Sequence, residues 1–442
     1  MSEKAKVYFV NTEQMVSWFG FAPDSLIDRL ERLWNHKEMK LNEWIKPGDK
    51  VIIKTHFGSS NQTRHLRPMY IRKIVDLVRK AGGIPWVAEC VGLGFLGQNP
   101  EAFMSTGPGY IYLAAQHGFT LGSMNAPIIL LDGVWGTDTF MVPIENGKYL
   151  KRIAVAMGLR AADKILIVAR FKGHDNAGFG GALKQLGIGC VGKQGKGEAH
   201  CGGNENIYIK HPENCTACGK CLEVCPSSCL SLDDGKIVLD SNRCIACMHC
   251  WSVCIVDKPK PEQRVFGLKR GLNADEQVER MMDNAAGVVK LLSSERIRYI
   301  NIAVDITAQC DCLPAAGHPL VPDQGILCSK DPVAIDQACV DLVTMARGLP
   351  GSPAETGIHC GSPEKGIHFD PDPSALEPGS EKLGIFSAFV EPELRSKIVE
   401  IQLSAAEALG IGSRSYELID VTEESKDAAS GEEVKEVRKN ER

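Results

Sequence analysis

The chain has 442 residues, of which 44% are hydrophobic and 24% are charged, and its formal net charge is −5. These values are typical of an ordinary globular protein with two or three domains, and they exclude the strongly basic composition of a nucleic-acid-binding protein. No apolar run reaches about 18 residues, so we expect no membrane span. The first residues lack the basic and apolar regions of a secretory signal, so we expect a cytoplasmic protein.

Strand-like apolar runs alternate with helical patterns along most of the chain. The expected strands are residues 7–10, 51–53, 84–88, 127–131, 165–169 and 297–304, and the expected helices are residues 69–80, 111–117, 273–292 and 331–348. Asn273 and Glu276 resemble a capping box, and Asp331 is the expected cap of the last helix. The alternation predicts an α/β fold, with helices on both faces of a mostly parallel sheet.

A cysteine-rich segment interrupts this alternation at residues 206–262. The spacing C-x2-C-x2-C-x3-C occurs twice in it, at Cys215, Cys218, Cys221 and Cys225, and again at Cys244, Cys247, Cys250 and Cys254. In this pattern three thiolates surround one [4Fe-4S] cube and the fourth reaches the neighbouring cube. We therefore expect two [4Fe-4S] clusters with crossed ligand sets: Cys215, Cys218, Cys221 and Cys254 for one, and Cys244, Cys247, Cys250 and Cys225 for the other.

Zinc and disulfides are the alternatives for these cysteines. Zinc sites usually use two C-x2-C pairs or mix cysteine with histidine, which fits the tight triple spacing less well. Disulfides do not require such a spacing and belong to oxidising compartments. Two [4Fe-4S] clusters would make the protein redox-active. His249 and Trp251 beside Cys250 are candidates for tuning their potential, although a surface position on the cysteine loop explains both residues as well.

The predicted organisation has four parts. Residues 1–205 and 263–420 are the two parts of the α/β domain, and residues 206–262 are an inserted ferredoxin-like module with a hairpin at residues 230–240. Pro259 and Pro261 mark the exit from the module. Residues 421–442 form a charged tail that we expect to be disordered.

Polar residues follow several of the predicted strands. Lys54 and His56 come after one apolar run, and Lys172 and His174 come after another. Glu89, Asp132 and Asp305 follow other strands. A Lys and a His separated by one residue point to the same side of an extended chain, and ligands bind beyond the carboxyl ends of parallel strands. We therefore predict a cationic site for a small anionic substrate or cofactor, with capping or solvation of strand ends as the alternative.

A glycine-rich run comes directly after the second Lys-His pair. Gly178, Gly180, Gly181 and Lys184 lie in it, and glycines allow backbone N–H groups to approach an anion closely. The run matches neither the dinucleotide-binding nor the P-loop pattern. We interpret it as a loop that binds or covers a cofactor or substrate, and a merely flexible loop is the alternative.

The pair Cys310 and Cys312 is a separate candidate. Together with Cys190, Cys201, His174 or His200, these thiols could bind a further metal ion. The C-x-C spacing alone is common by chance, so the sequence leaves this question open.

The motifs together resemble a known family. Before the cysteine-rich segment they are Lys54-Thr-His56-Phe-Gly58, Phe171-Lys-Gly-His174, Gly178-Phe-Gly-Gly-Ala-Leu-Lys184 and Gly187-Ile-Gly-Cys190. The two cysteine motifs come next. After them are Asp305-Ile-Thr, Cys310-Asp-Cys312, Pro322-Asp323-Gln-Gly325 and Ser329-Lys-Asp-Pro-Val-Ala-Ile-Asp336. Over residues 50–345 the chain is similar to the uncharacterised iron–sulfur centre proteins, a family with a domain of unknown function. The resemblance implies two [4Fe-4S] clusters and a larger domain, and it leaves the reaction open. The cysteine segment resembles bacterial two-cluster ferredoxins, except that Ile255 stands where those usually have Pro.

Three functions fit these features. In the first, which we favour, the clusters pass electrons at low potential to a substrate or cofactor at the strand ends and glycine-rich loop, as in an oxidoreductase or its subunit, with a protein as redox partner. In the second, the chain is an electron carrier or assembly subunit whose α/β domain docks another protein. In the third, the clusters are regulatory or structural. Lys54, His56, Lys172 and His174 favour the first function, because a pure carrier does not need them.

Overall fold

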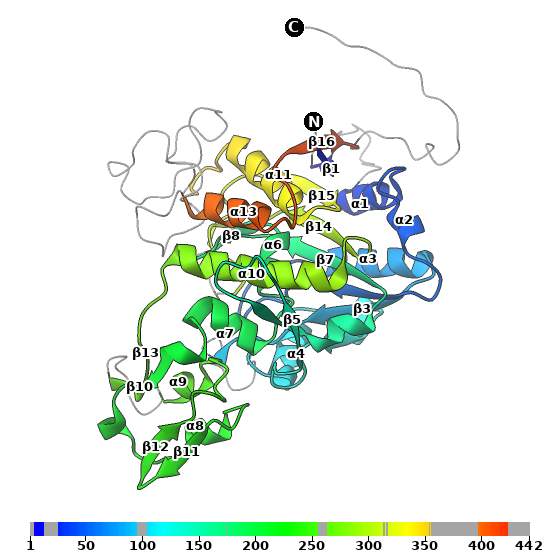
Figure 1. Cartoon of the computed structure of the whole chain (residues 1–442). Helices are drawn as coiled ribbons and strands as arrows, with labels where there is room; N and C mark the ends of the chain where they lie inside the picture. Colours follow the sequence, from blue (N-terminus) through cyan, green and yellow to red (C-terminus); the bar gives the residue numbers. More distant parts are fainter. Residues whose placement is uncertain are drawn as a thin grey trace, which may run out of the picture.

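The computed structural model describes residues 4–12, 25–94, 104–174, 176–254, 263–312, 314, 317–352, 354 and 397–422. They form an α/β body from which the cysteine-rich segment extends, at the lower left of Figure 1. The predicted tail beyond Thr422, the exit residues Pro259 and Pro261, and Ile255 lie outside the described residues. Among the helices that are described, none is both long and apolar enough to cross a bilayer.

A sheet of eight described strands lies at the centre of the body, in the order β16-β1-β15-β14-β7-β2-β3-β4. Their bounds are Tyr416–Asp420, Ala5–Asn11, Gly325–Ser329, Ile297–Ala303, Lys164–Arg170, Lys50–Lys54, Ile84–Glu89 and Ile128–Leu130. Within this sheet β15 runs antiparallel to β1 and β14, and the other neighbouring strands are parallel. The predicted mostly parallel α/β sheet is therefore confirmed.

Helices cover both faces of the sheet, as predicted (Figure 1). One face packs against α1 (Leu26–Asn35), α2 (Leu41–Trp44), α3 (Pro68–Lys80) and α4 (Gly107–Gln116), and the other against α6 (Ala182–Gly187), α10 (Ala274–Leu292), α11 (Pro332–Met345) and α13 (Ile398–Ala408).

Strand β7 shows why both faces are apolar. Ile165 and Ile167 pack in the core beneath α10, and Leu166 and Val168 pack in the core on the opposite face. Alternate residues of a strand point to opposite faces, so a strand buried on both sides must be apolar throughout.

Some elements differ from the predictions. Asn273 makes no side-chain bond at the start of α10, and Glu276 instead pairs with Arg270 at 2.7 Å and Arg280 at 2.9 Å. The expected capping box is therefore wrong, because two guanidinium groups compete for the carboxylate. The sequence analysis also missed α13, β16 and the hairpin of β5 (Thr139–Pro143) and β6 (Arg152–Ala156).

The cysteine-rich segment has its own small strands and helices. Strand β10 (Ile207–Ile209) pairs antiparallel with β13 (Phe266–Leu268), which comes after the predicted boundary at residue 262. The predicted hairpin is present as β11 (Leu230–Asp233) and β12 (Lys236–Leu239), and Asp234 and Gly235 have positive φ angles at its turn. Short helices α8 (Lys220–Glu223) and α9 (His249–Val253) follow the two cysteine loops.

Two glycines let the body approach the second cysteine loop closely. The Gly94 N–H donates to the Cys247 carbonyl oxygen at 2.8 Å, and a Cβ at Gly94 would overlap the backbone of His249. A Cβ at Gly197, in α7 (Lys193–Cys201), would lie 2.7 Å from the Ala246 carbonyl oxygen. The loop is therefore held against the body by backbone contacts that larger residues would block.

Replacing Asp331 with Ala tests the cap of α11. Asp331 Oδ1 accepts from the N–H groups of Val333 at 2.8 Å and Ala334 at 2.9 Å, and Oδ2 accepts from Ser413 at 2.9 Å. We expect a loss of about 1–2 kcal/mol in the unfolding free energy of the body, measured by urea denaturation. The exposed substitution Glu43→Ala is the control and should leave the transition almost unchanged. An equal effect of both substitutions would contradict the capping role.

Candidate functional site

A cavity of about 200 Å³ lies at the carboxyl ends of β2 and β3, beside the hairpin of β8 (Lys172–His174) and β9 (Gly178–Gly180). Of the predicted pocket residues, six line it: His56, Lys172, His174, Gly180, Gly181 and Lys184. Lys54 is fully buried beneath it. Gly178 lies apart from the cavity and packs against Val399.

A buried carboxylate joins the first Lys-His pair. Glu89 Oε2 lies 2.7 Å from Lys54 Nζ, and Glu89 Oε1 lies 2.9 Å from His56 Nδ1. Tyr110 OH lies 2.9 Å from the same Nδ1. Burial by itself lowers the pKa of His56, but its contacts with Cys312 and Glu89 raise it to about 9. His56 is therefore a cation at neutral pH, whereas the charge of Lys54 is balanced by Glu89.

The second lysine is also paired. Lys172 Nζ lies 2.9 Å from Asp311 Oδ1, and Arg170 Nε lies 3.5 Å from Asp311 Oδ2, with all three side chains buried. Burial raises the pKa of Asp311, but the two cations hold it well below its usual range. Lys172 therefore neutralises a buried carboxylate. The two Lys-His pairs do approach one another, since His56, Lys172 and His174 line one cavity, but both lysines are engaged in ion pairs.

The other strand-end carboxylates have separate partners. Asp132 is fully buried, and its Oδ2 lies 3.7 Å from Lys196 Nζ. Asp305 faces Arg67 at 2.5 Å and Arg64 at 3.4 Å instead of the cavity. Besides Lys172, the lysines that line the cavity are Lys184 and Lys196.

The glycine-rich run is regular structure and not a flexible loop. It forms β9 and then α6, and the fully buried Asp336 accepts from the N–H groups of Ala182 and Leu183, both at 2.8 Å. A Cβ at Gly181 would collide with this carboxylate. The N–H groups at the start of α6 are therefore bonded to Asp336, and the run shapes the cavity wall instead of offering a loop of N–H donors.

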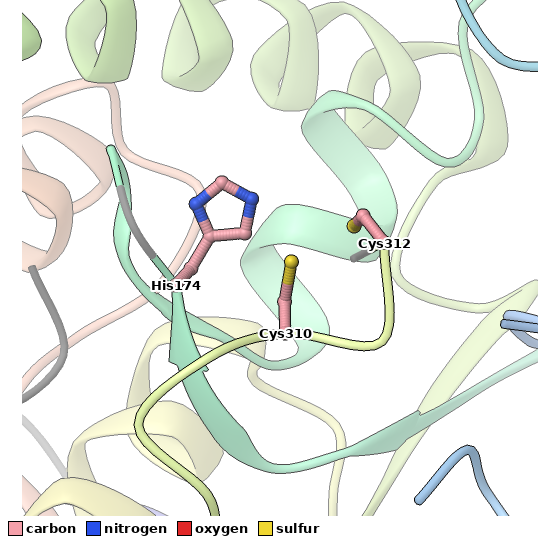
Figure 2. Close-up of side chains that lie close together, drawn as sticks. All are labelled: His174, Cys310 and Cys312. Atoms are coloured by element: carbon pink, nitrogen blue, oxygen red, sulfur yellow. The ribbon is translucent and has the colours of Figure 1, made fainter. Parts of the chain in front are cut away.

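Three potential donors meet at one wall of the cavity (Figure 2). One ligand atom each of His174, Cys310 and Cys312 lies within 4.8 Å of the others. Lys184 Nζ lies 3.6 Å from Cys312 Sγ. The hydrogen bond with Cys310, together with Lys184, His174 and His56, holds the pKa of the Cys312 thiol well below its ordinary value despite burial.

The remaining candidates for a further metal do not join this group. Cys190 and Cys201 are buried in two different apolar clusters. His200 lines the cavity, where its Nδ1 donates to the Lys196 carbonyl oxygen at 2.9 Å, and burial lowers its pKa to about 4. His200 is therefore a neutral imidazole whose Nε2 is the basic nitrogen.

The eight motif cysteines line two further cavities in the cysteine-rich segment. One cavity is lined by Cys215, Cys218, Cys221 and Cys254, and the other by Cys225, Cys244, Cys247 and Cys250. Cys229, which lies outside the repeated spacing, also lines the second cavity, and its sulfur lies 3.4 Å from that of Cys225. The grouping of the motif cysteines matches the crossed ligand sets expected from their spacing.

The two candidate tuning residues have different surroundings. His249 is 6% exposed, so its expected surface position is wrong, and its Nε2 lies 2.8 Å from Lys193 Nζ. Burial and the nearby Lys193 lower its pKa to about 3, which makes it neutral. Trp251 is half-buried and stacks beneath the guanidinium group of Arg264.

Comparison with known proteins identifies a family for this architecture. The family model described as "Domain of unknown function (DUF362)" matches residues 51–341, which is more than half of the chain. The chain belongs to the DUF362 family. This confirms the predicted membership of a family of unknown function, whereas the two [4Fe-4S] clusters remain a prediction.

The DUF362 chain has no match among functionally curated proteins. Among solved structures, it is similar to the lactate racemase apoprotein from Thermoanaerobacterium thermosaccharolyticum, with 11% sequence identity and a TM-score of 0.37. That alignment covers 94% of this chain and 83% of the other.

The sequence analysis missed two residues that shape the site. Tyr110 comes from α4, whose pattern gives no sign of a site, and it reaches His56 only because α4 packs over the ends of β2 and β3. Asp311 stands in the sequence only as the residue between the two cysteines of the C-x-C pair, and its ion pair with Lys172 depends on the packing of distant segments.

Replacing Glu89 with Gln tests the buried network. The change leaves Lys54 charged and buried without its carboxylate, so we expect a loss of about 3–5 kcal/mol in unfolding free energy. Burial raises the pKa of Glu89, but Lys54 and His56 hold it below its ordinary value of 4.5. The stabilisation should therefore be complete above pH 4.5 in the parent and decline as the pH falls through the lower pKa of the folded state.

Urea denaturation at several pH values measures both effects. The control is Asp76→Asn, which breaks an exposed pair with Arg72 and should cost much less. A Glu89→Gln variant as stable as the control variant would contradict the structural role of the network.

Proposed function

We propose that the protein is a low-potential iron–sulfur oxidoreductase, or a subunit of one, that delivers electrons to a small anionic ligand in the cavity of the α/β body. The observation that carries the proposal is the hydrogen bond from Gly94 to the Cys247 carbonyl oxygen. Cys247 is one of the expected cluster ligands, and Gly92 and Leu93 line the cavity. The residues that line the cavity and the residue that bonds to the cysteine loop are thus consecutive in one short backbone segment, Gly92 to Gly94.

The donor sets fit [4Fe-4S] clusters. Each of the two cavities of the segment gathers four motif thiols, as a cube requires. Bound clusters of this kind supply single-electron transfer at low potential. The cavity of the α/β body is lined by Cys90, Cys310 and Cys312, which do not belong to the repeated spacing.

The backbone of the two cysteine loops also supports this fit. Ala217 and Ala246 occupy equivalent places and both have a φ of 54°, and the equivalent residues Gly219 and Met248 have φ values of 76° and 64°. Left-handed conformations cost alanine and methionine about 1 kcal/mol or more each. They turn backbone N–H groups toward sulfur: the Ala246 N–H lies 3.4 Å from Cys244 Sγ. Such bonds stabilise thiolates and offset the strain.

The exposure of the two cavities suggests a direction for the electrons. Cys218, in the first set, is exposed, whereas Cys247, in the second set, is buried against the body. A redox partner protein can approach the first set from solvent. The second set adjoins the cavity wall, so the segment would connect a partner at the surface to a ligand inside.

The charges of the cavity indicate an anionic ligand. His56 is cationic at neutral pH because its contacts raise its pKa to about 9, and Lys184 and Lys196 also line the cavity. Glu89 and Asp311 are engaged by buried cations. A carboxylate, phosphate or thiolate group would complement the positive charge of His56, Lys184 and Lys196.

Metal analysis of the anaerobically purified protein tests the clusters. We expect about eight iron and eight sulfide per chain, and a spectrum of two interacting reduced cubes in electron paramagnetic resonance. Cys218→Ser should lose about half of the iron, because one of the two sets is incomplete. The control Cys339→Ala, at a buried thiol of α11, should keep all of it. Stoichiometric zinc without iron would overturn the proposal.

Replacing Gly94 with Ala tests the contact between the loop and the cavity wall. A methyl group there overlaps the backbone of His249, so the cysteine loop must shift while its thiols stay together. We expect the iron content of the parent, but several-fold slower reoxidation of the reduced protein by the small anionic metabolites of a cell extract. Gly122→Ala is the control, since its added methyl group meets only Thr120, at 3.9 Å. Reoxidation of the parent by the protein fraction alone would indicate an electron carrier instead.

A further inference from the structure

The C-x-C turn is held so that both of its thiols face the cavity. Asp311, between them, is 1% exposed and is bound by Lys172 at 2.9 Å and Arg170 at 3.5 Å. The side chain of Asp311 therefore points into the body. Its neighbours Cys310 and Cys312 both line the cavity, and Figure 2 shows their sulfurs on the same side as the His174 ring.

The two thiols have unequal surroundings. Cys310 is 1% exposed, whereas Cys312 is less buried and lies 3.6 Å from Lys184 Nζ. The hydrogen bond with Cys310 and the nearby Lys184 and His174 hold the pKa of Cys312 well below its ordinary value. The thiolate form of Cys312 is therefore favoured, and a second thiol lies beside it. A thiolate with a neighbouring thiol is the arrangement of dithiol redox sites.

The orientation of His174 favours this interpretation over a metal site. The backbone N–H groups of Asn176 and Ala177 donate to His174 Nδ1 at 3.3 Å and 3.1 Å. Nδ1 is therefore an acceptor, and the proton of the ring is on Nε2, which faces the sulfurs in Figure 2. A histidine that binds a metal through Nε2 normally donates Nδ1–H to a neighbouring oxygen, and here that nitrogen meets two donors.

We propose that Cys310 and Cys312 form a redox-active dithiol–disulfide couple that reduces a small anionic disulfide in the cavity. The inference rests on the proposed function for its electron source. It names the class of substrate for the same site, and it assigns the chemistry to residues of the α/β body.

The reaction balances in three steps. The Cys312 thiolate attacks one sulfur of the substrate disulfide, forms a mixed disulfide and releases the first substrate thiolate. The Cys310 sulfur then attacks Cys312, releases the second thiolate and loses its proton as the Cys310–Cys312 disulfide forms. Two electrons and one proton return this disulfide to the thiol–thiolate pair. On the proposed function, these electrons arrive from the cysteine-rich segment through the wall formed by Gly92 and Leu93.

The cavity provides groups for each step. Lys184 lies beside the Cys312 sulfur and stabilises the thiolate, and His174 Nε2–H donates a hydrogen bond toward it. His56 and Lys196 add positive charge for the anionic groups of the substrate.

Thiol trapping measures the couple without any assay of turnover. The anaerobic protein is incubated with oxidised glutathione, as a small anionic disulfide, and its free thiols are alkylated and mapped by peptide mass spectrometry. We expect an internal Cys310–Cys312 disulfide and release of reduced glutathione. Cys310→Ser should keep glutathione bound to Cys312, and Cys312→Ser should take up none. Cys328→Ala, at a buried thiol of the sheet, is the control and should behave as the parent.

A second measurement separates this inference from the proposed function. The protein with its disulfide formed receives electrons from a photochemical donor, and the thiols are counted by alkylation as the visible absorption is recorded. Return of both thiols supports both proposals. A disulfide that forms with glutathione but stays oxidised under the photochemical donor overturns the electron route and leaves the couple standing. Cysteines that never pair, with one tightly held zinc ion lost in Cys312→Ser, overturn the couple in favour of a metal site.

Discussion

The buried ion pair between Lys54 and Glu89 holds together the end of the sheet at which the cavity forms. It joins the last residues of β2 and β3 where no water competes for either charge, and the same carboxylate positions His56. Removing one partner leaves a buried charge without compensation, which is far more costly than the pair itself is stabilising. The position of His56, and with it one side of the cavity, depends on this carboxylate together with the Tyr110 hydroxyl.

A second buried carboxylate, that of Asp311, holds side chains in place at the opposite wall of the cavity. Asp311 pairs with Lys172 and Arg170, as Glu89 pairs with Lys54 and His56. These four side chains at the two strand ends are therefore largely engaged in structural ion pairs. The side chains left for a ligand are therefore fewer than the number of cations in the sequence suggests. The most reactive group at the cavity is therefore the Cys312 sulfur, which lies among positively charged and hydrogen-bonding groups.

The sequence predicts the parts of this molecule that depend on local pattern. The apolar runs of β2 and β7 are buried on both faces of the sheet, and Asp331 before Pro332 is a local cap signal. Contacts between distant segments were not predictable in the same way. Neither the pairing of Lys172 with Asp311 nor the approach of Tyr110 to His56 has a local signature, because each depends on how elements far apart in the chain pack. The capping box at Asn273 failed for the related reason that Arg270 and Arg280 offer Glu276 a stronger partner.

Gly94 belongs to two structures at once, since it continues the cavity wall of Gly92 and Leu93 and also bonds to Cys247. Any ligand that displaces this wall must also displace the cysteine loop, and the reverse holds as well. If the loop holds the cluster of the proposed function, binding in the cavity and the redox state of that cluster are linked, and linkage is reciprocal: a ligand that binds the reduced form more tightly raises the reduction potential by the corresponding free energy. On the proposed function, the contact between Gly94 and Cys247 would thus make the midpoint potential of the cluster depend on whether the cavity is occupied.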